Sequence, residues 1–289
     1  MTEQALTARP DEVLLDDGRR VDVVEEVVRS APLGLRFWDP ATDRPVVEGL
    51  LVQAQPEAGG PISTARPSSS GVHGFGALPT TRDAEHGSVV DFGAPVPYRV
   101  LVIDTRHRFV TMSLTTQAPV AGVQPVSSAV PGHPLFSSAL RPVPAGQIAV
   151  RLDLRDESRP LVGSPDTYAP AAHALVVLTL EGAPRYAVAD ATGRALVLAP
   201  APVFASPSGG SGPIDPQDQA WPAVVEVRYE ALTATGFPGV PDFSDIAGQA
   251  VSGAKYESVT STSHAVDIEY GEALVVRSPG RSDLLVTPA

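Results

Sequence analysis

Histidine is the residue type in this chain best suited to metal binding or acid–base chemistry. The chain has six of them: His73, His86, His107, His133, His173 and His264. No two have the close spacing of a His-x-x-x-His motif, and cysteine is absent, so there is no thiolate ligand. We therefore predict no metal site and no cofactor, and we interpret the histidines as exposed loop residues.

Serine and paired carboxylates are the other candidates for catalysis. The sequence GGSG at residues 209–212 does not have the G-x-S-x-G spacing of a nucleophile turn. The acidic pairs at residues 16–17 and 25–26 are adjacent in sequence, and adjacent side chains on a strand point to opposite faces. These patterns predict a non-enzymatic protein. A hydrolase whose site residues meet only in the folded chain is the third of three functional hypotheses.

Four residues are candidate anchors for a protein partner: Trp38, Trp221, Arg106 and Arg108. Each tryptophan lies beside a strand end, next to Asp or Pro, and tryptophan is enriched at interface hot spots. The alternative for both is a place in the edge of a β-sandwich core. The two arginines lie in a predicted hairpin, where they would pair with an acidic partner surface or face water.

The composition favours β-structure with long loops. The 289 residues include 30 Pro and 25 Gly, a proline share about twice the average usage of roughly 5%. Proline at this density breaks helices and suits turns and edge strands. A hydrophobic content of 43% supports a packed core, and a net charge of −12 argues against a nucleic-acid-binding surface.

The first residues of the chain carry no targeting signal. Residues 1–20 are polar and acidic and lack the apolar segment of a secretory signal. No run in the chain approaches the roughly 18 apolar residues of a membrane span. We therefore expect assembly in the cytoplasm and no membrane span.

Strand and turn patterns follow one another along the chain. Near the N-terminus, residues 13–28 place an Asp-Gly pair between Val-rich runs, which predicts a hairpin; a helix over residues 21–29 is the alternative. Residues 172–200 have the pattern strand, turn, strand, turn, strand, with the turns at residues 181–184 and 190–193. The chain shows no convincing long helix.

Two stretches of sequence match each other. Residues 43–47, DRPVV, correspond to residues 158–162, SRPLV, and each follows an alternating strand. Each unit then closes with a Gly turn and a strand that ends in Pro, at residues 70–79 and 192–200. The match predicts one small β-sandwich module used twice.

These motifs carry a resemblance. The RPLV sequence at residues 159–162, followed by ALVVL at 174–178 and ADATGRALVL at 189–198, resembles the carboxypeptidase regulatory-like module. That module is a transthyretin-like β-sandwich without catalytic residues. Over residues 31–289, the order of LRFWDPATDRPVVEGLLVQA, DQAWPAV and YGEALVVRSPG is similar to proteins of phage-tail-like extracellular contractile injection systems.

The resemblance implies a structural or accessory part of such a particle, at a tail end as a cap or at the baseplate. Its partners would be sheath, tube, cap or baseplate proteins, within an oligomeric assembly and without nucleic acid. A carbohydrate- or cell-surface-binding β-sandwich protein is the second hypothesis. The predicted fold is all-β, with two transthyretin-like or Ig-like modules. The expected ranges are an N-terminal hairpin or arm (1–30), a first module (31–120), a Pro-rich linker (121–145), a second module (146–206) and a C-terminal β segment (217–289).

Overall fold

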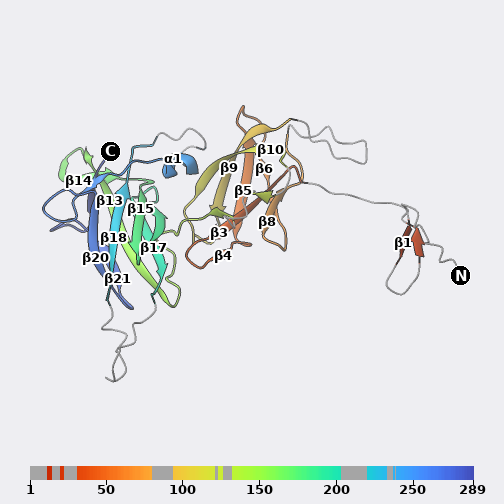
Figure 1. Ribbon diagram of the computed structural model, residues 1–289. Helices are drawn as coiled ribbons and strands as arrows, with labels where there is room; N and C mark the ends of the chain where they lie inside the picture. The colour runs from red at the N-terminus through yellow and green to blue at the C-terminus, as the bar shows by residue number, and fades with distance from the viewer. Residues whose placement is uncertain are drawn as a thin grey trace, which may run out of the picture.

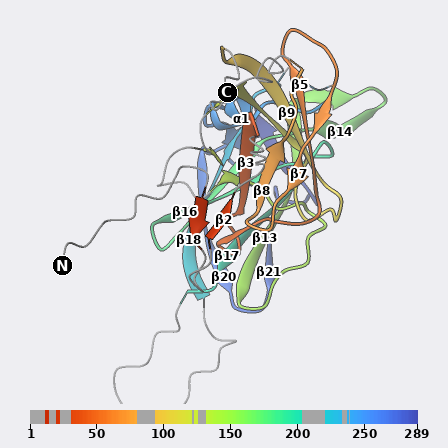
Figure 2. The same ribbon diagram turned by 90° about the vertical axis from the view of Figure 1, so that its right-hand side faces the viewer.

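The computed structural model describes residues 12–14, 20–22, 31–79, 94–120, 123–125, 132–202, 220–232, 237 and 239–289. Over these residues the chain is all-β, as predicted, with one short helix. Most strands belong to two β-sandwich modules, which follow one another along the chain and contact each other at their facing ends (Figure 1). Figure 2 looks along the line that joins them, with the first module in front.

The first module packs two sheets around one core. One sheet has the strand order β6-β5-β9-β10, and the other contains β8-β3-β11 together with β7, β4 and β12. Along β9 every second side chain is buried, including Tyr98, Val100 and Val102. The period-2 alternation of the sequence therefore builds this core. The strands are β3 (Leu33–Asp39), β4 (Arg44–Pro45), β5 (Leu50–Pro56), β6 (Ser63–Thr64), β7 (Arg66–Pro67), β8 (Val72–Phe75), β9 (Val96–Asp104), β10 (Met112–Ala118), β11 (Val123–Gln124) and β12 (His133–Pro134).

The second module has the same plan. One sheet has the order β16-β15-β18-β20, and in the other β13 pairs with β17, β21, β22 and β14. Ile148, Val150, Leu152 and Leu154 alternate along β13 and face the core. The strands are β13 (Gln147–Leu161), β14 (Ser164–Pro170), β15 (Leu175–Leu180), β16 (Ala183–Val188), β17 (Arg194–Pro200), β18 (Ala220–Arg228), β19 (Gly253–Ala254), β20 (Ser263–Glu269), β21 (Ala273–Val276) and β22 (Leu284–Thr287).

The two modules share one topology. In chain order, β3, β5, β6, β8, β9, β10, β11 and β12 correspond to β13, β15, β16, β17, β18, β20, β21 and β22. The pairing senses agree as well: β8 and β17 run antiparallel to the first strand of their module, whereas β11, β12, β21 and β22 run parallel to it. The Gly turns of the sequence repeat precede equivalent strands, β8 and β17. The other matched sequences are not equivalent, because Arg44–Pro45 form β4 whereas Arg159–Pro160 lie at the end of β13.

Three of the expected domain ranges, 121–145, 146–206 and 217–289, do not match the way in which the strands pair. The described part of the Pro-rich range 121–145 pairs with β3 through β11 and β12, so it completes the first sandwich. The range 217–289 shares its core with 146–206, because β18 pairs with β15, and β21 and β22 pair with β13. The strands of 146–206 alone, β13 to β17, would leave both sheets of that sandwich incomplete.

The N-terminal hairpin is present. Strand β1 (Glu12–Leu14) pairs antiparallel with β2 (Arg20–Asp22), with Val13 opposite Val21. This pairing agrees with the Asp-Gly turn signal rather than with a helix that begins at Val21. The acidic pairs at 16–17 and 25–26, the GGSG sequence at 209–212 and His86 lie outside the described residues.

Two glycines occupy equivalent turns at the start of equivalent strands. Gly71 has φ +78° just before β8, and Gly193 has φ +86° just before β17. A Cβ at Gly193 would lie 2.3 Å from the carbonyl oxygen of Leu154, which accepts a hydrogen bond from the Ala171 amide. Left-handed backbone and close approach together require glycine at this position.

Gly193→Ala is expected to destabilise the second module more than Gly182→Ala does. Both glycines have positive φ, but a Cβ at Gly182 meets no atom within 4 Å. The backbone cost of roughly 1–2 kcal/mol applies to both variants, and the clash adds at least about 2 kcal/mol at Gly193. Chemical denaturation of the two variants measures the difference, and equal midpoints would contradict the close approach.

Two histidines of the first module lie on either side of Phe37: His73 is buried and His133 is half-buried. The rings of His73 and His133 lie 5.4 and 6.0 Å from the Phe37 ring. Burial lowers the pKa of His133 from 6.5 to about 4 and also lowers the pKa of His73. Since the unfolded chain takes up protons near pH 6.5 and the folded chain does not, the free energy of unfolding should decrease as the pH falls through that value.

We expect a loss on the order of 2 kcal/mol between pH 7 and pH 5. The double variant His73→Gln/His133→Gln should flatten this dependence, because glutamine does not titrate. His107→Asn is the matched control: His107 is exposed at φ +56°, a conformation that asparagine tolerates. An unchanged pH slope in the double variant would show that these rings are not responsible.

Candidate protein-interaction surface

The junction between the modules is organised by a buried ion pair. Asp39 ends β3, and Arg141 lies in the segment between β12 and β13. The two guanidinium nitrogens of Arg141 donate to the two carboxylate oxygens of Asp39 at 3.0 and 2.5 Å. The side chains are only 8% and 6% exposed. A bidentate pair of this kind fixes the position of both backbones.

The same carboxylate shapes the turn that follows β3. It accepts hydrogen bonds from the Ala41 amide at 3.0 Å and from the Thr42 hydroxyl at 2.7 Å. Burial raises the pKa of Asp39, but the hydrogen bonds and charge of Arg141, with the Thr42 hydroxyl, outweigh it. The net pKa is therefore below the ordinary value. The carboxylate is thus ionised at neutral pH and satisfied on every side.

The turn contacts the second module. Ala41 packs in a small apolar cluster with Ala149 of β13 and with Leu196 and Leu198 of β17. Its carbonyl oxygen accepts a hydrogen bond from the side-chain amide of Gln147. Asp39 therefore positions the turn, and the turn positions the first module against the second.

A second contact lies on the opposite side of the junction. Helix α1 (Phe243–Ala247) is capped by Asp242, whose carboxylate accepts from the Ser244 amide. The other carboxylate oxygen of Asp242 accepts from the Thr115 hydroxyl of β10, at 3.0 Å. Phe243 stacks on Phe136 at 5.9 Å. This insertion of the second module covers part of the β10 edge of the first.

A groove lies between the two modules. It has a volume of about 680 Å³ and is lined by Pro40, Ala41, Thr42, Asp43 and Arg44 of the first module and by Pro144, Ala145, Gly146, Gln147, Arg185 and Pro200. A hollow of about 200 Å³ continues it past Leu135, Ser137, Pro184, Tyr186 and Leu198, and shares Pro40, Ala41 and Arg185. Two arginines and one aspartate are the charged residues of this lining.

The predicted arginine anchors are engaged within the chain. Arg106 pairs with Glu48 at 3.0 Å, and both side chains are largely exposed. Arg108 donates to the buried Asp104 and to the Glu48 carbonyl oxygen, and its guanidinium lies 5.1 Å from the Phe109 ring. These contacts fix the hairpin between β9 and β10, so Arg108 is committed to its own module. Arg106 presents an exposed ion pair.

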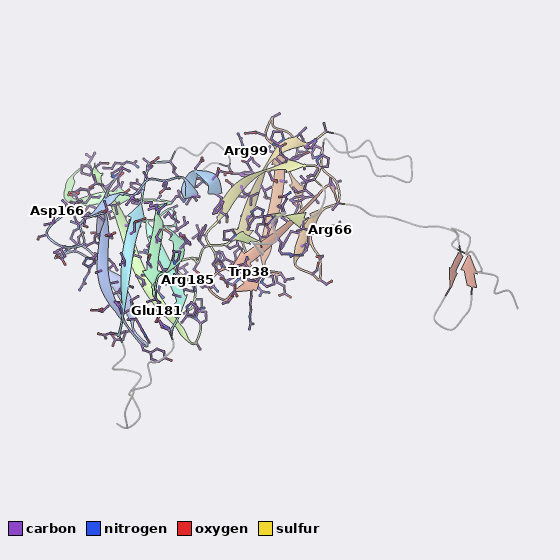
Figure 3. All side chains as sticks on the ribbon, viewed as in Figure 1. Trp38, Arg66, Arg99, Asp166, Glu181 and Arg185 are labelled. Carbon is purple, nitrogen blue, oxygen red and sulfur yellow. The ribbon has the colours of Figure 1, made fainter. Side chains whose placement is uncertain are left out.

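The two tryptophans occupy different environments. Trp38 is half-buried on β3, and Figure 3 shows it on the part of the first module that faces the second. Trp221 is 7% exposed in the core of the second module, where its ring meets Tyr270 edge-on at 6.3 Å. Of the two, Trp38 alone keeps indole surface open to a partner.

The described histidines do not assemble a metal site. No group of three or more potential metal ligands occurs among the described residues. The interpretation of the histidines as exposed loop residues is wrong for His73, which is 1% exposed in β8, because alternation along that strand points its ring inward. It is also wrong for His133 and His264, which are half-buried in strands β12 and β20. Asp39 and Arg141, which the sequence analysis did not single out, are instead the charged residues that the fold brings together.

Comparison with known proteins assigns no family. No family model matches the chain, and no curated protein matches it. Solved structures that resemble it include the Bacillus anthracis TIE protein, with 13% identity and a TM-score of 0.25 over 90% of this chain and 34% of that one. The C-terminal fragment of pilus adhesin SpaC from Lactobacillus rhamnosus GG has 11% identity and a TM-score of 0.18, over 89% and 98% of the two chains.

A Ca²⁺-stabilized adhesin with which an Antarctic bacterium reaches out and binds ice has 12% identity and a TM-score of 0.16, over 91% of this chain and 55% of that one. The chain spans about a third of the length of the TIE protein chain that it matches. TM-scores this low do not establish a common fold, so these likenesses support no functional assignment. Within the described ranges, no helix is long and apolar enough to cross a membrane.

Arg141→Met should strongly destabilise the protein, because it leaves the Asp39 carboxylate buried without its cation. Removing one member of a buried pair costs about 3–5 kcal/mol. Asp39→Asn/Arg141→Met should recover part of this loss, since the amide oxygen still accepts from the turn and carries no charge. The matched control is Arg106→Met, whose exposed pair contributes about 1 kcal/mol or less.

Fluorescence during chemical denaturation measures these effects, because each module holds one of the two tryptophans. The Trp221→Phe background leaves Trp38 as the reporter of the first module. A change no larger for Arg141→Met than for Arg106→Met would contradict the role of the pair.

Proposed function

We propose that this protein is a non-enzymatic structural component of a contractile, phage-tail-like injection particle, located at a tail end as a cap or at the baseplate. It would act by holding two β-sandwich modules in a fixed relation and presenting their surfaces to neighbouring subunits. Assembly would take place in the cytoplasm, within a multi-subunit particle.

The observation that carries this proposal is the pair of contacts between the modules. The Asp39 turn packs against β13 and β17, and the α1 insertion contacts β10 and Phe136. Two contacts at separate places restrict both bending and rotation, which a single flexible linker would permit. A rigid two-module body suits a protein whose role is to set the spacing of its neighbours.

Three further features support a structural role. The order of motifs over residues 31–289 resembles proteins of contractile injection systems. The charged side chains that the fold gathers, Asp39 with Arg141 and Asp104 with Arg108, hold turns and are saturated by hydrogen bonds within the chain. The duplicated module offers two similar platforms for protein contacts.

The proposal predicts that the protein co-purifies with assembled particles. Particles from cells that express an affinity-tagged copy should contain it at constant stoichiometry after gradient sedimentation. Deletion of its gene should alter particle length, completeness or composition in electron micrographs.

Intact particles in the deletion strain, together with absence of the protein from purified particles, would contradict the proposal. If that result came with specific binding to a glycan array or to whole cells, the carbohydrate- or cell-surface-binding hypothesis would replace it. A tagged β-sandwich protein of unrelated origin controls for nonspecific co-sedimentation.

A further inference from the structure

The groove between the modules is lined by two arginines, one from each module. Seven arginines of the described residues form ion pairs with carboxylates: Arg99, Arg106, Arg108, Arg141, Arg155, Arg228 and Arg281. Arg44 and Arg185 form none within the part of the chain that the structure describes. Both line the groove, on opposite modules.

The backbones that carry these two side chains are fixed. Arg44 lies on β4, directly opposite Asp39 in the antiparallel pairing of β4 with β3. This position is next to the turn that the Asp39 carboxylate stabilises. Arg185 stands on β16 opposite Leu178 of β15. Figure 3 shows Arg185 on the side of the second module that faces the first. The separation of the two guanidinium-bearing positions is therefore set by the junction rather than by a loop.

The groove presents apolar surface between these charges. Its walls include Pro40, Pro144 and Pro200, and the adjoining hollow adds Leu135, Pro184 and the half-exposed Tyr186. Proline and tyrosine walls suit an extended polypeptide that places its own apolar side chains between charged ones. Guanidinium groups bind carboxylates in a bidentate manner.

We propose that this groove is the docking site for an extended acidic segment of a partner protein, whose carboxylates pair with Arg44 and Arg185. Charge complementarity identifies the partner. The groove lining has two arginines and one aspartate, so it is positively charged in a chain whose net charge is −12, and it would attract an acidic segment. The same net charge opposes a nucleic acid, which would approach a strongly negative molecule. The inference goes beyond the proposed function, because it holds for any assembly in which this protein takes part.

The test uses the full chain and a fluorescein-labelled peptide of repeating Glu-Pro-Ala, with a peptide of repeating Gln-Pro-Ala as the uncharged match. Fluorescence anisotropy at low salt should detect binding of the Glu peptide and much weaker binding of the Gln peptide. Arg44→Gln/Arg185→Gln should weaken binding of the Glu peptide by about tenfold or more.

Arg66→Gln/Arg277→Gln is the matched control. It makes the same change in net charge at two exposed arginines that line neither part of the groove, and it should leave binding unchanged. None of the four arginines forms an ion pair with another described residue, so both double variants should keep the wild-type denaturation midpoint, which the tryptophan fluorescence checks.

Several results would overturn the inference. These are equal loss of binding in the two double variants, equal affinity for the two peptides, or binding of dextran sulfate as tight as that of the Glu peptide. Self-association of the wild type that Arg44→Gln/Arg185→Gln abolishes would also overturn it, since the occupant would then be a second copy. The peptide-binding measurement needs no particle. A negative result therefore contradicts the groove inference alone, whereas a failure to co-purify with particles contradicts the proposed function.

Discussion

The contact between the modules depends on one buried carboxylate. Asp39 accepts hydrogen bonds from the backbone of Ala41, the hydroxyl of Thr42 and both terminal nitrogens of Arg141. A buried charge is costly unless every lone pair has a partner. The Asp39 carboxylate thus holds both the turn after β3 and the segment before β13. If either of them moved, the carboxylate would lose hydrogen bonds or become exposed to water. The apolar contact of Ala41 with β13 and β17 follows from that constraint.

The duplicated topology explains why each sandwich needs strands from distant parts of its range. In both modules the first strand receives parallel partners from the end of the range: β11 and β12 on β3, and β21 and β22 on β13. A parallel partner cannot be supplied by a tight turn, so the chain must cross to the other sheet before it returns. Neither module is complete until its last strand is in place, which ties 217–289 to 146–206.

Local patterns in the sequence predicted local structure. The Asp-Gly hairpin, the alternation along β3 and β13 and the glycine turns before β8 and β17 are all encoded within a few residues. What the sequence did not reveal is long-range. Asp39 and Arg141 lie 102 positions apart, and neither has a neighbour that marks it as half of a pair. Strands β11 and β12 are two residues long in a Pro-rich context, which local propensity assigns to a loop. The prediction that His73 is exposed failed for a related reason. Only the pairing of β8 with β3 decides which face of β8 points into the core.

The groove and the junction share one physical origin. The modules meet through a turn on one side and a helix on the other, rather than through two flat sheet faces. Such a contact leaves a channel, and its lining comes from the residues that flank the contact, including Arg44 beside the Asp39 turn and Gln147, which donates to Ala41. The buried Asp39–Arg141 pair therefore sets the spacing of Arg44 and Arg185, although it contacts neither side chain. Arg44 lies on the strand beside this saturated carboxylate and forms no ion pair with another described residue, so its guanidinium is available to an acidic group of a partner.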